Sequence, residues 1–387
     1  MAINLSAAER VLPDDAIAVS ITSLEDGPIA PNAREVQILG CAKDYGGSRA
    51  ALVVARELLA MGRTADATVN PVLTFVLAGN GKRIFHEECA EYGLSVGPAS
   101  ADILNGTGIR PDVKLITPSQ TGGLEGWMLE QFPDAKAAAL DDYPEATRRA
   151  IRHALALEQP IPLILAIHKI ARARYALRFP GRQIRVVDLE NSPVFDKYAD
   201  QDTRAIRLKR QGELGVPDEE SLAVIALPVL EEGGLEVATT IKAELAKLEQ
   251  PLWYAIRWHP DDTDAAEYER MFRGGRYLDT SRYPIGYVIP AATVMGGPRS
   301  TEVWSAAAQG IDNFTILNGI PEDFSAPLVD IGASWGVYAD ELSVAIPVLI
   351  SGTSMRFRQL REGIERCRPK GDAGRRAAAA ILSLAQL

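Results

Sequence analysis

Two segments late in the chain combine charged, hydroxyl and glycine residues at a spacing that suits a diphosphate. The first reads RWHPDD and carries Arg257 and His259, which alternate along the end of an apolar run and so point to one side. A guanidinium and an imidazole that converge on one point match the oxygens of a diphosphate. A lone histidine is more often a structural residue, and this alternative stays open for His259.

The second segment, MGGPRSTEVW, runs from apolar residues through glycines into an expected helix. Backbone N–H groups and hydroxyls at a helix start can hold phosphate oxygens, an arginine adds charge, and a glutamate can accept hydrogen bonds from a ribose. An ordinary helix cap in an α/β unit is the alternative. The candidate residues are Gly296, Gly297, Arg299, Ser300, Thr301 and Glu302.

Three earlier loops supply candidates for a second ligand. GCAKDYGGSR combines paired glycines with Asp44, a potential general base, and PSQTGGLEG and LDDY offer hydroxyls and a further acid. Plain turns and helix caps are the alternatives for each loop. The candidate contacts to this ligand are Tyr45, Gly46, Gly47, Arg49, Ser119 and Thr121, and the candidate catalytic residues are Asp44, Asp142 and His259.

Short apolar runs that alternate with amphipathic stretches must position these loops. This alternation predicts βαβ units, parallel sheets and ligands beyond the carboxyl ends of the strands. We expect two doubly wound, Rossmann-like α/β domains that face a central cleft. Their expected bounds are 35–185 and 186–372, after an arm or edge strand over 1–34 and before a C-terminal helix over 373–387. The expected strands span 36–40, 71–79, 112–119, 135–143, 183–189, 222–229, 251–260 and 313–318, and the expected helices span 48–62, 82–93, 124–132, 235–250, 264–275 and 300–310.

Composition excludes several classes of protein. The chain has 387 residues, of which 47% are apolar and 24% charged, as in soluble globular proteins. A net charge of −10 argues against general nucleic-acid binding, and no apolar run approaches the ~20 residues of a membrane helix. The three cysteines and four histidines show no metal-ligand spacing, so no metal is expected. Widely spaced cysteines and a start without a secretory pattern predict a cytoplasmic protein.

The two late segments resemble the nucleotide-binding half of GT-B glycosyltransferases. That family has a strand that ends in a His-Pro-type motif, here Arg257–Pro260. A small-residue loop then leads to Ser-Thr and Glu on a helix that ends in glycine, here Gly296–Glu302 and Gly310. The segment ENSPVFDKY (190–198) is similar to those that open the second domain of such enzymes. The Glu-x7-Glu pattern of the retaining subfamily is absent, since Gly310 stands where its second glutamate would be.

The resemblance implies a glycosyltransferase that moves a sugar from a nucleotide-diphosphate donor to a hydroxyl-bearing acceptor without metal or resident cofactor. The C-terminal domain would hold the donor, and the N-terminal loops the acceptor. Three alternatives stay open: a hydrolysing nucleotide-sugar 2-epimerase, a polyol-phosphate transferase and a non-catalytic nucleotide-binding module. The epimerase family carries paired glutamates where this chain has Glu302 alone. The nucleotide base, the sugar, the acceptor and assembly into a homo-oligomer stay undetermined by the sequence.

Overall fold

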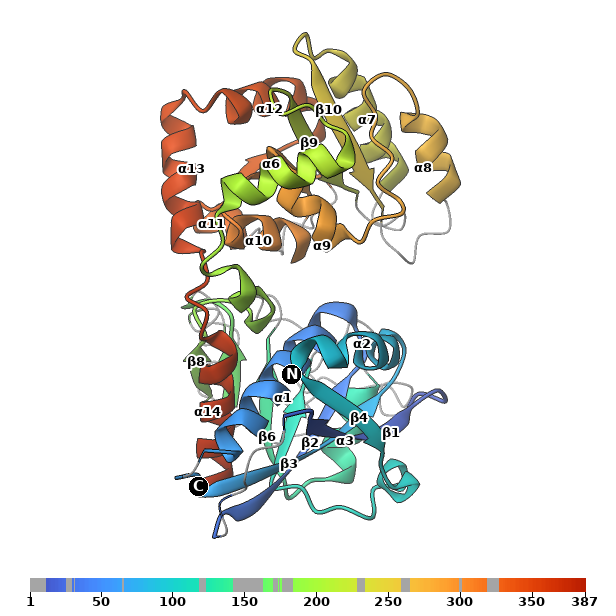
Figure 1. Ribbon diagram of the computed structural model, residues 1–387. Helices are drawn as coiled ribbons and strands as arrows, with labels where there is room; N and C mark the ends of the chain where they lie inside the picture. The colour runs from blue at the N-terminus through green and yellow to red at the C-terminus, as the bar shows by residue number, and fades with distance from the viewer. Residues whose placement is uncertain are drawn as a thin grey trace, which may run out of the picture. The chain divides into compact units, whose positions relative to one another are not determined.

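The chain forms two α/β units, which are described separately. The first unit comprises residues 1–196 and 369–387, and the second comprises residues 197–368. In Figure 1 the first unit is blue to green with a red C-terminal helix, and the second runs from green to red. The computed structural model describes residues 12–25, 30, 32–64, 66–117, 123–141, 163–169, 173, 175, 184–227, 234–258, 265–298, 301–318 and 327–387.

The first unit is built on one sheet with helices on both faces. Its strands are β1 (Ile17–Ser23), β2 (Arg34–Ala42), β3 (Val69–Leu77), β4 (Leu94–Pro98), β5 (Val113–Ile116), β6 (Lys136–Leu140), β7 (Leu163–Ala166) and β8 (Arg185–Asp188). Its helices are α1 (Tyr45–Gly62), α2 (Asn80–Glu88), α3 (Leu124–Gln131) and α14 (Ala373–Gln386), with 3-10 turns at Cys89–Tyr92, Ala101–Asn105 and, crossing into the second unit, Pro193–Tyr198.

Strand β1 lies inside this sheet. The strand order is β4-β1-β3-β2-β5-β6-β7-β8, in which β2, β3 and β5 to β8 run parallel to their neighbours. Strand β1 pairs antiparallel with β3 and also with β4. The expectation of a surface arm or edge strand over 1–34 is therefore wrong for Ile17–Ser23, because both edges of this strand are hydrogen-bonded.

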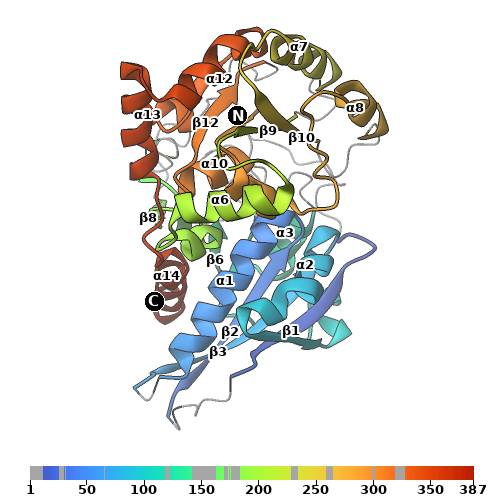
Figure 2. The same cartoon turned by 45° about the horizontal axis from the view of Figure 1, so that its top comes forward.

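Strand β2 shows why the sequence builds three layers. Ile38, Leu39 and Cys41 are all fully buried, and they alternate between the two faces of the sheet. Ile38 packs in a cluster with residues of α1 and α14, and Leu39 and Cys41 pack with residues of α3. Helices α1 and α14 lie side by side in Figure 1, and Figure 2 shows α1 lying along β2 and β3.

The second unit has a smaller sheet, ordered β10-β9-β11-β12-β13, in which every pair is parallel. Its strands are β9 (Ser221–Ala226), β10 (Leu252–Arg257), β11 (Val294–Gly297), β12 (Asp312–Ile316) and β13 (Trp335–Val337). Its helices are α6 (Thr203–Leu214), α7 (Gly234–Ala246), α8 (Ala265–Phe272), α9 (Ile285–Val288), α10 (Thr301–Ala308), α11 (Pro327–Asp330), α12 (Leu342–Ser351) and α13 (Met355–Arg366), with 3-10 turns at Ile289–Ala291 and Ala339–Glu341.

The expected strands and helices are present, with small shifts at their ends. The sequence analysis does not predict β4, β13, α12 or α13, and it leaves the segment that forms β7 undecided. The units divide after Asp196 rather than at the predicted residue 185. Strand β8 pairs with β7 and so belongs to the first sheet. The predicted C-terminal helix is α14, which also belongs to the first unit.

Candidate functional site

The strand order of the second sheet brings the two late segments to one place. Strand β9 lies between β10 and β11, and all three strands run parallel. Strand order reverses direction at β9, and ligands of open α/β sheets bind outside the carboxyl ends of strands at such a switch point. The segment that follows β10 and the segment that follows β11 therefore flank the carboxyl end of β9.

Arg257 ends β10 on one side of the switch point. Its Nη1 atom donates hydrogen bonds to the carbonyl oxygen of Thr280 at 2.7 Å and to Thr280 Oγ1 at 3.4 Å. Its backbone carbonyl accepts from Leu227 N at 2.7 Å, just past the end of β9. Burial lowers the pKa of the Arg257 guanidinium, and the charges of Tyr277, Glu302 and Asp279 oppose this shift. Arg257 is thus a half-buried cation that acidic groups surround.

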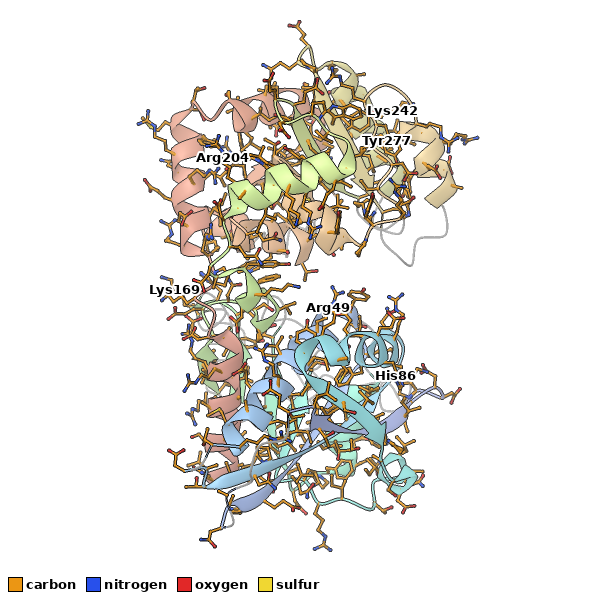
Figure 3. The ribbon with its side chains drawn as sticks, viewed as in Figure 1. Arg49, His86, Lys169, Arg204, Lys242 and Tyr277 are labelled. Carbon is orange, nitrogen blue, oxygen red and sulfur yellow. The ribbon has the colours of Figure 1, made fainter. Side chains whose placement is uncertain are left out.

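Thr280 belongs to a segment that sequence reasoning missed. Tyr254 N donates to the Arg276 carbonyl at 3.1 Å and Leu278 N donates to the Tyr254 carbonyl at 2.8 Å, which joins this segment to the free edge of β10. Tyr277 lies beside β10 (Figure 3), where burial raises the pKa of its phenol to about 12. The polar run RYLDTSRY is the available signal, since it directly follows the glycine pair Gly274–Gly275 at the end of an expected helix.

Gly296 and Gly297 lie within β11 and not in the expected loop. A Cβ atom on Gly296 would lie 1.8 Å from Cζ of Phe314, and one on Gly297 would lie 3.0 Å from Cβ of Ala226. Close packing against β12 and β9 therefore explains both glycines. The expectation of a glycine loop at these two positions is wrong, because the strand continues to Gly297 before the chain turns toward α10.

Helix α10 begins on the other side of the switch point with Thr301 and Glu302. Thr301 Oγ1 donates to Glu302 Oε2 at 3.4 Å, and both residues are half-buried. The first turn of a helix carries partial positive charge and free N–H groups, which suit an anion. Glu302 is near enough to Arg257 to raise the pKa of its guanidinium. Arg257, Thr301 and Glu302 thus share one neighbourhood, whereas Arg299, Ser300 and His259 lie outside the described residues.

The first unit repeats the same topology. Strand β2 lies between β3 and β5, so its carboxyl end is a second switch point. Thr117 Oγ1, just after β5, donates to the Cys41 carbonyl at 2.7 Å and ties the two strand ends together. Asp44 follows β2 and precedes Tyr45, Gly46 and Gly47 in the first turn of α1. Ser119, Thr121 and Asp142 lie outside the described residues.

Arg49 is held by the protein itself. Its Nε donates to Glu88 Oε2 at 2.7 Å and its Nη2 to Glu88 Oε1 at 2.5 Å, the two-pronged geometry in which a guanidinium binds a carboxylate. Burial lowers the pKa of Arg49, and the bonds and charge of Glu88 raise it further, so that the net shift is upward. The predicted ligand contact is therefore already the partner of an internal carboxylate.

Two negative findings concern the described part of the chain. No group of three or more His, Cys, Asp or Glu side chains there could hold a metal ion. No helix in the same residues is long and apolar enough to cross a membrane. The three cysteines, Cys41, Cys89 and Cys367, are buried free thiols.

Comparisons with known proteins reveal the fold. No family model matches the chain, and no curated protein matches it by sequence. Among solved structures, a UDP-GlcNAc 2-epimerase from Neisseria meningitidis bound to UDP-GlcNAc aligns with TM-score 0.65 at 12% identity, over 90% of this chain and 100% of that chain. A glycosyltransferase from Rickettsia africae aligns with TM-score 0.52 at 11% identity, over 91% and 96%. The wall teichoic acid polymerase TagF aligns with TM-score 0.53 at 10% identity, over 92% and 90%. The chain therefore has the GT-B-type fold, with two Rossmann-like units.

Proposed function

We propose that this protein is an enzyme that acts on a nucleoside-diphosphate sugar, and that it transfers the sugar to a hydroxyl-bearing acceptor. The observation that carries the proposal is the neighbourhood of Arg257, Thr301 and Glu302 at the switch point of the second sheet. A cation, a helix start and a carboxylate together match a diphosphate joined to a ribose. The fold adds support, because the compared epimerase is bound to UDP-GlcNAc.

The roles of the donor-binding residues follow from their charge. Arg257 and Arg299 would stabilise the negative charge that develops on the departing diphosphate, together with the N–H and hydroxyl groups of Ser300 and Thr301. Glu302 would accept hydrogen bonds from the ribose hydroxyls, and His259 would donate to the diphosphate. With two arginines and a helix start available, the proposed reaction needs neither a metal nor a resident cofactor.

The acceptor would bind at the switch point of the first sheet. Its hydroxyl oxygen would attack the anomeric carbon, the bond from that carbon to the diphosphate oxygen would break, and the diphosphate would leave with the electron pair. Asp44 or Asp142 would take the hydroxyl proton if the reaction inverts. The backbone of Gly46 and Gly47 and the hydroxyls of Ser119 and Thr121 would orient the acceptor.

A 2-epimerase is the second candidate, and one observation favours it. The compared epimerase aligns with TM-score 0.65, whereas the glycosyltransferase and TagF align with 0.52 and 0.53. Against it, Glu302 stands alone where the epimerase family carries paired glutamates. The two reactions differ in their need for an acceptor. Incubation with a nucleotide sugar alone would give an epimerised product or free nucleotide only from an epimerase of the hydrolysing kind.

A thermal-shift panel of UDP, GDP, CDP, ADP and dTDP, each with and without its sugar, tests the donor site. A ligand that binds only the folded state raises the melting temperature by mass action, and the nucleotide that does so identifies the base. Arg257→Ala should abolish that shift. Arg276→Ala is the matched control, since Arg276 lies on the neighbouring segment and pairs with Glu220 at 2.6 Å. No shift with any nucleotide would contradict both enzyme candidates.

A polyol-phosphate transferase and a non-catalytic binding module make different forecasts for the same panel. The transferase would respond to CDP linked to a polyol and not to a nucleotide sugar. The module would bind a nucleotide and release no product from its sugar conjugate. Chromatography of the reaction mixture after incubation with the nucleotide sugar that binds would separate these outcomes from glycosyl transfer.

A further inference from the structure

The ring of Tyr45 lies between two guanidinium groups. Cζ of Arg49 lies 4.4 Å from the ring centroid, and Cζ of Arg83 lies 5.4 Å from it. Arg49 Nη2 also donates to the Tyr45 hydroxyl at 3.3 Å. We call Tyr45, Arg49, Arg83 and Glu88 the Tyr45 cluster; it joins the beginnings of α1 and α2 (Figure 3 labels Arg49).

The two arginines of the cluster differ in their partners. Arg49 binds the Glu88 carboxylate through two hydrogen bonds, so its charge is balanced. Arg83 is exposed, and in the described part of the chain it makes no ion pair and touches only the Tyr45 ring. The neighbouring Lys82 is also balanced, by Asp15 at 2.6 Å. Arg83 is therefore the cation of this edge whose charge has no protein carboxylate beside it.

The starts of the two helices differ in the same way. Asp15 Oδ2 accepts a hydrogen bond from Gly79 N at 3.0 Å, so a protein carboxylate already lies at the start of α2. At the start of α1, the Asp44 side chain makes no cap hydrogen bond, and the Ser48 hydroxyl donates to the Asp44 carbonyl at 2.6 Å. The first turn of α1 thus keeps N–H groups that no side chain caps, next to the unbalanced Arg83.

We propose that the Tyr45 cluster recognises a phosphate group on the acceptor. Arg83 would bind the phosphate oxygens, the Tyr45 ring would hold the guanidinium in place, and the first-turn N–H groups of α1 would complete the site. The Arg49–Glu88 pair fixes the ring from its other side. The inference rests on the proposed function for the word acceptor, and the substrate class that it adds is a phosphorylated hydroxyl compound.

Titration calorimetry of the full chain with inorganic phosphate tests the site directly. We expect phosphate binding that weakens at least about tenfold in Arg83→Ala and is partly restored in Arg83→Lys. The matched control is Arg34→Ala, because Arg34 begins β2 at the opposite edge of the same sheet and pairs with Asp112 at 3.1 Å. A melting curve for each variant shows that the fold is retained.

Two results would overturn the proposal: no phosphate binding by the wild-type protein, or equal binding by wild type and Arg83→Ala. Arg257→Ala identifies the competing site, since phosphate held in the second unit would be lost in that variant and kept in Arg83→Ala. The nucleotide panel reports separately on the proposed function. Arg83→Ala should keep the nucleotide shift, so failure at the Tyr45 cluster and failure at the donor site give different patterns.

Discussion

Gly296 faces the ring of Phe314 across two paired strands so closely that a Cβ atom would lie 1.8 Å from Cζ of that ring. The ring itself is fully buried and cannot swing into solvent. A glycine at position 296 is therefore a requirement of packing between β11 and β12. Its effect on the ligand edge is indirect, because it sets where β11 ends and where the turn toward α10 begins.

Gly296→Ala should therefore destabilise the second unit by about 1–3 kcal/mol, the usual cost of overpacking. The clash depends on the bulk of Phe314, so the double variant Gly296→Ala with Phe314→Leu should lose less than the sum of the two single changes. Urea unfolding of the four proteins measures this coupling. Strict additivity would show that the ring does not contact the new methyl group.

Asp196 should anchor the C-terminal helix. Its carboxylate accepts hydrogen bonds from Ala373 N at 3.1 Å and Gly374 N at 2.8 Å, in the first turn of α14. Asp196→Ala should cost about 1–2 kcal/mol of unfolding free energy, the effect of losing a helix cap. Asp372→Ala is the control, since Asp372 precedes α14 but pairs with Arg376 and makes no cap bond. Equal losses in the two variants would contradict the anchoring role.

Local pattern predicts most of the fold because most of its strands are buried on both faces. Runs such as those around Ile38 and Ile225 alternate with amphipathic helices, and this alternation is typical of βαβ units. Strand β1 eludes the pattern because its neighbours in the sheet, β3 and β4, are far away in sequence. The origin of α14 in the first unit is also non-local, since Asp196 and Gly374 meet only after the whole second unit has been built.

The candidate site could be predicted to the level of loops and not of partners. Strand ends identify Arg257 and Glu302, because parallel topology collects such ends at one edge. Nothing in the spacing of Arg49 and Glu88 reveals that they bind each other, so Arg49 looked like a ligand contact. The turn after β9 escaped selection, although the pair Gly233–Gly234 before α7 is a signal of the same kind as Gly46–Gly47.

Arg299→Ala should lower turnover without unfolding the protein. Loss of one positive group aimed at a developing diphosphate charge costs about 10²–10³ in rate. Release of nucleoside diphosphate from the nucleotide sugar that binds, measured with a saturating acceptor, gives the rate. Arg273→Ala is the control, because Arg273 is exposed and pairs with Glu269 at 2.6 Å. Unchanged kinetics in Arg299→Ala would remove Arg299 from the mechanism.

Lys114 should make the stability of the first unit depend on pH in the alkaline range. Its buried ammonium donates to the Phe132 carbonyl at 2.6 Å, at the end of α3. Burial lowers the pKa of Lys114 from 10.5 to about 8, and the charge of Asp134 opposes the shift. Above pH 8 the unfolded chain then binds more protons than the folded one, so the free energy of unfolding rises with pH until about 10.5.

Lys114→Met removes this titration, and the comparison of the two proteins cancels the other groups that titrate in the same range. From pH 8 to pH 10, the free energy of unfolding of the wild type should rise relative to that of the variant. The rise should approach about 3 kcal/mol if the full shift acts on stability. Urea unfolding at several pH values measures the difference. A flat difference would mean that Lys114 keeps its ordinary pKa, and that its hydrogen bond to Phe132 offsets the cost of burial.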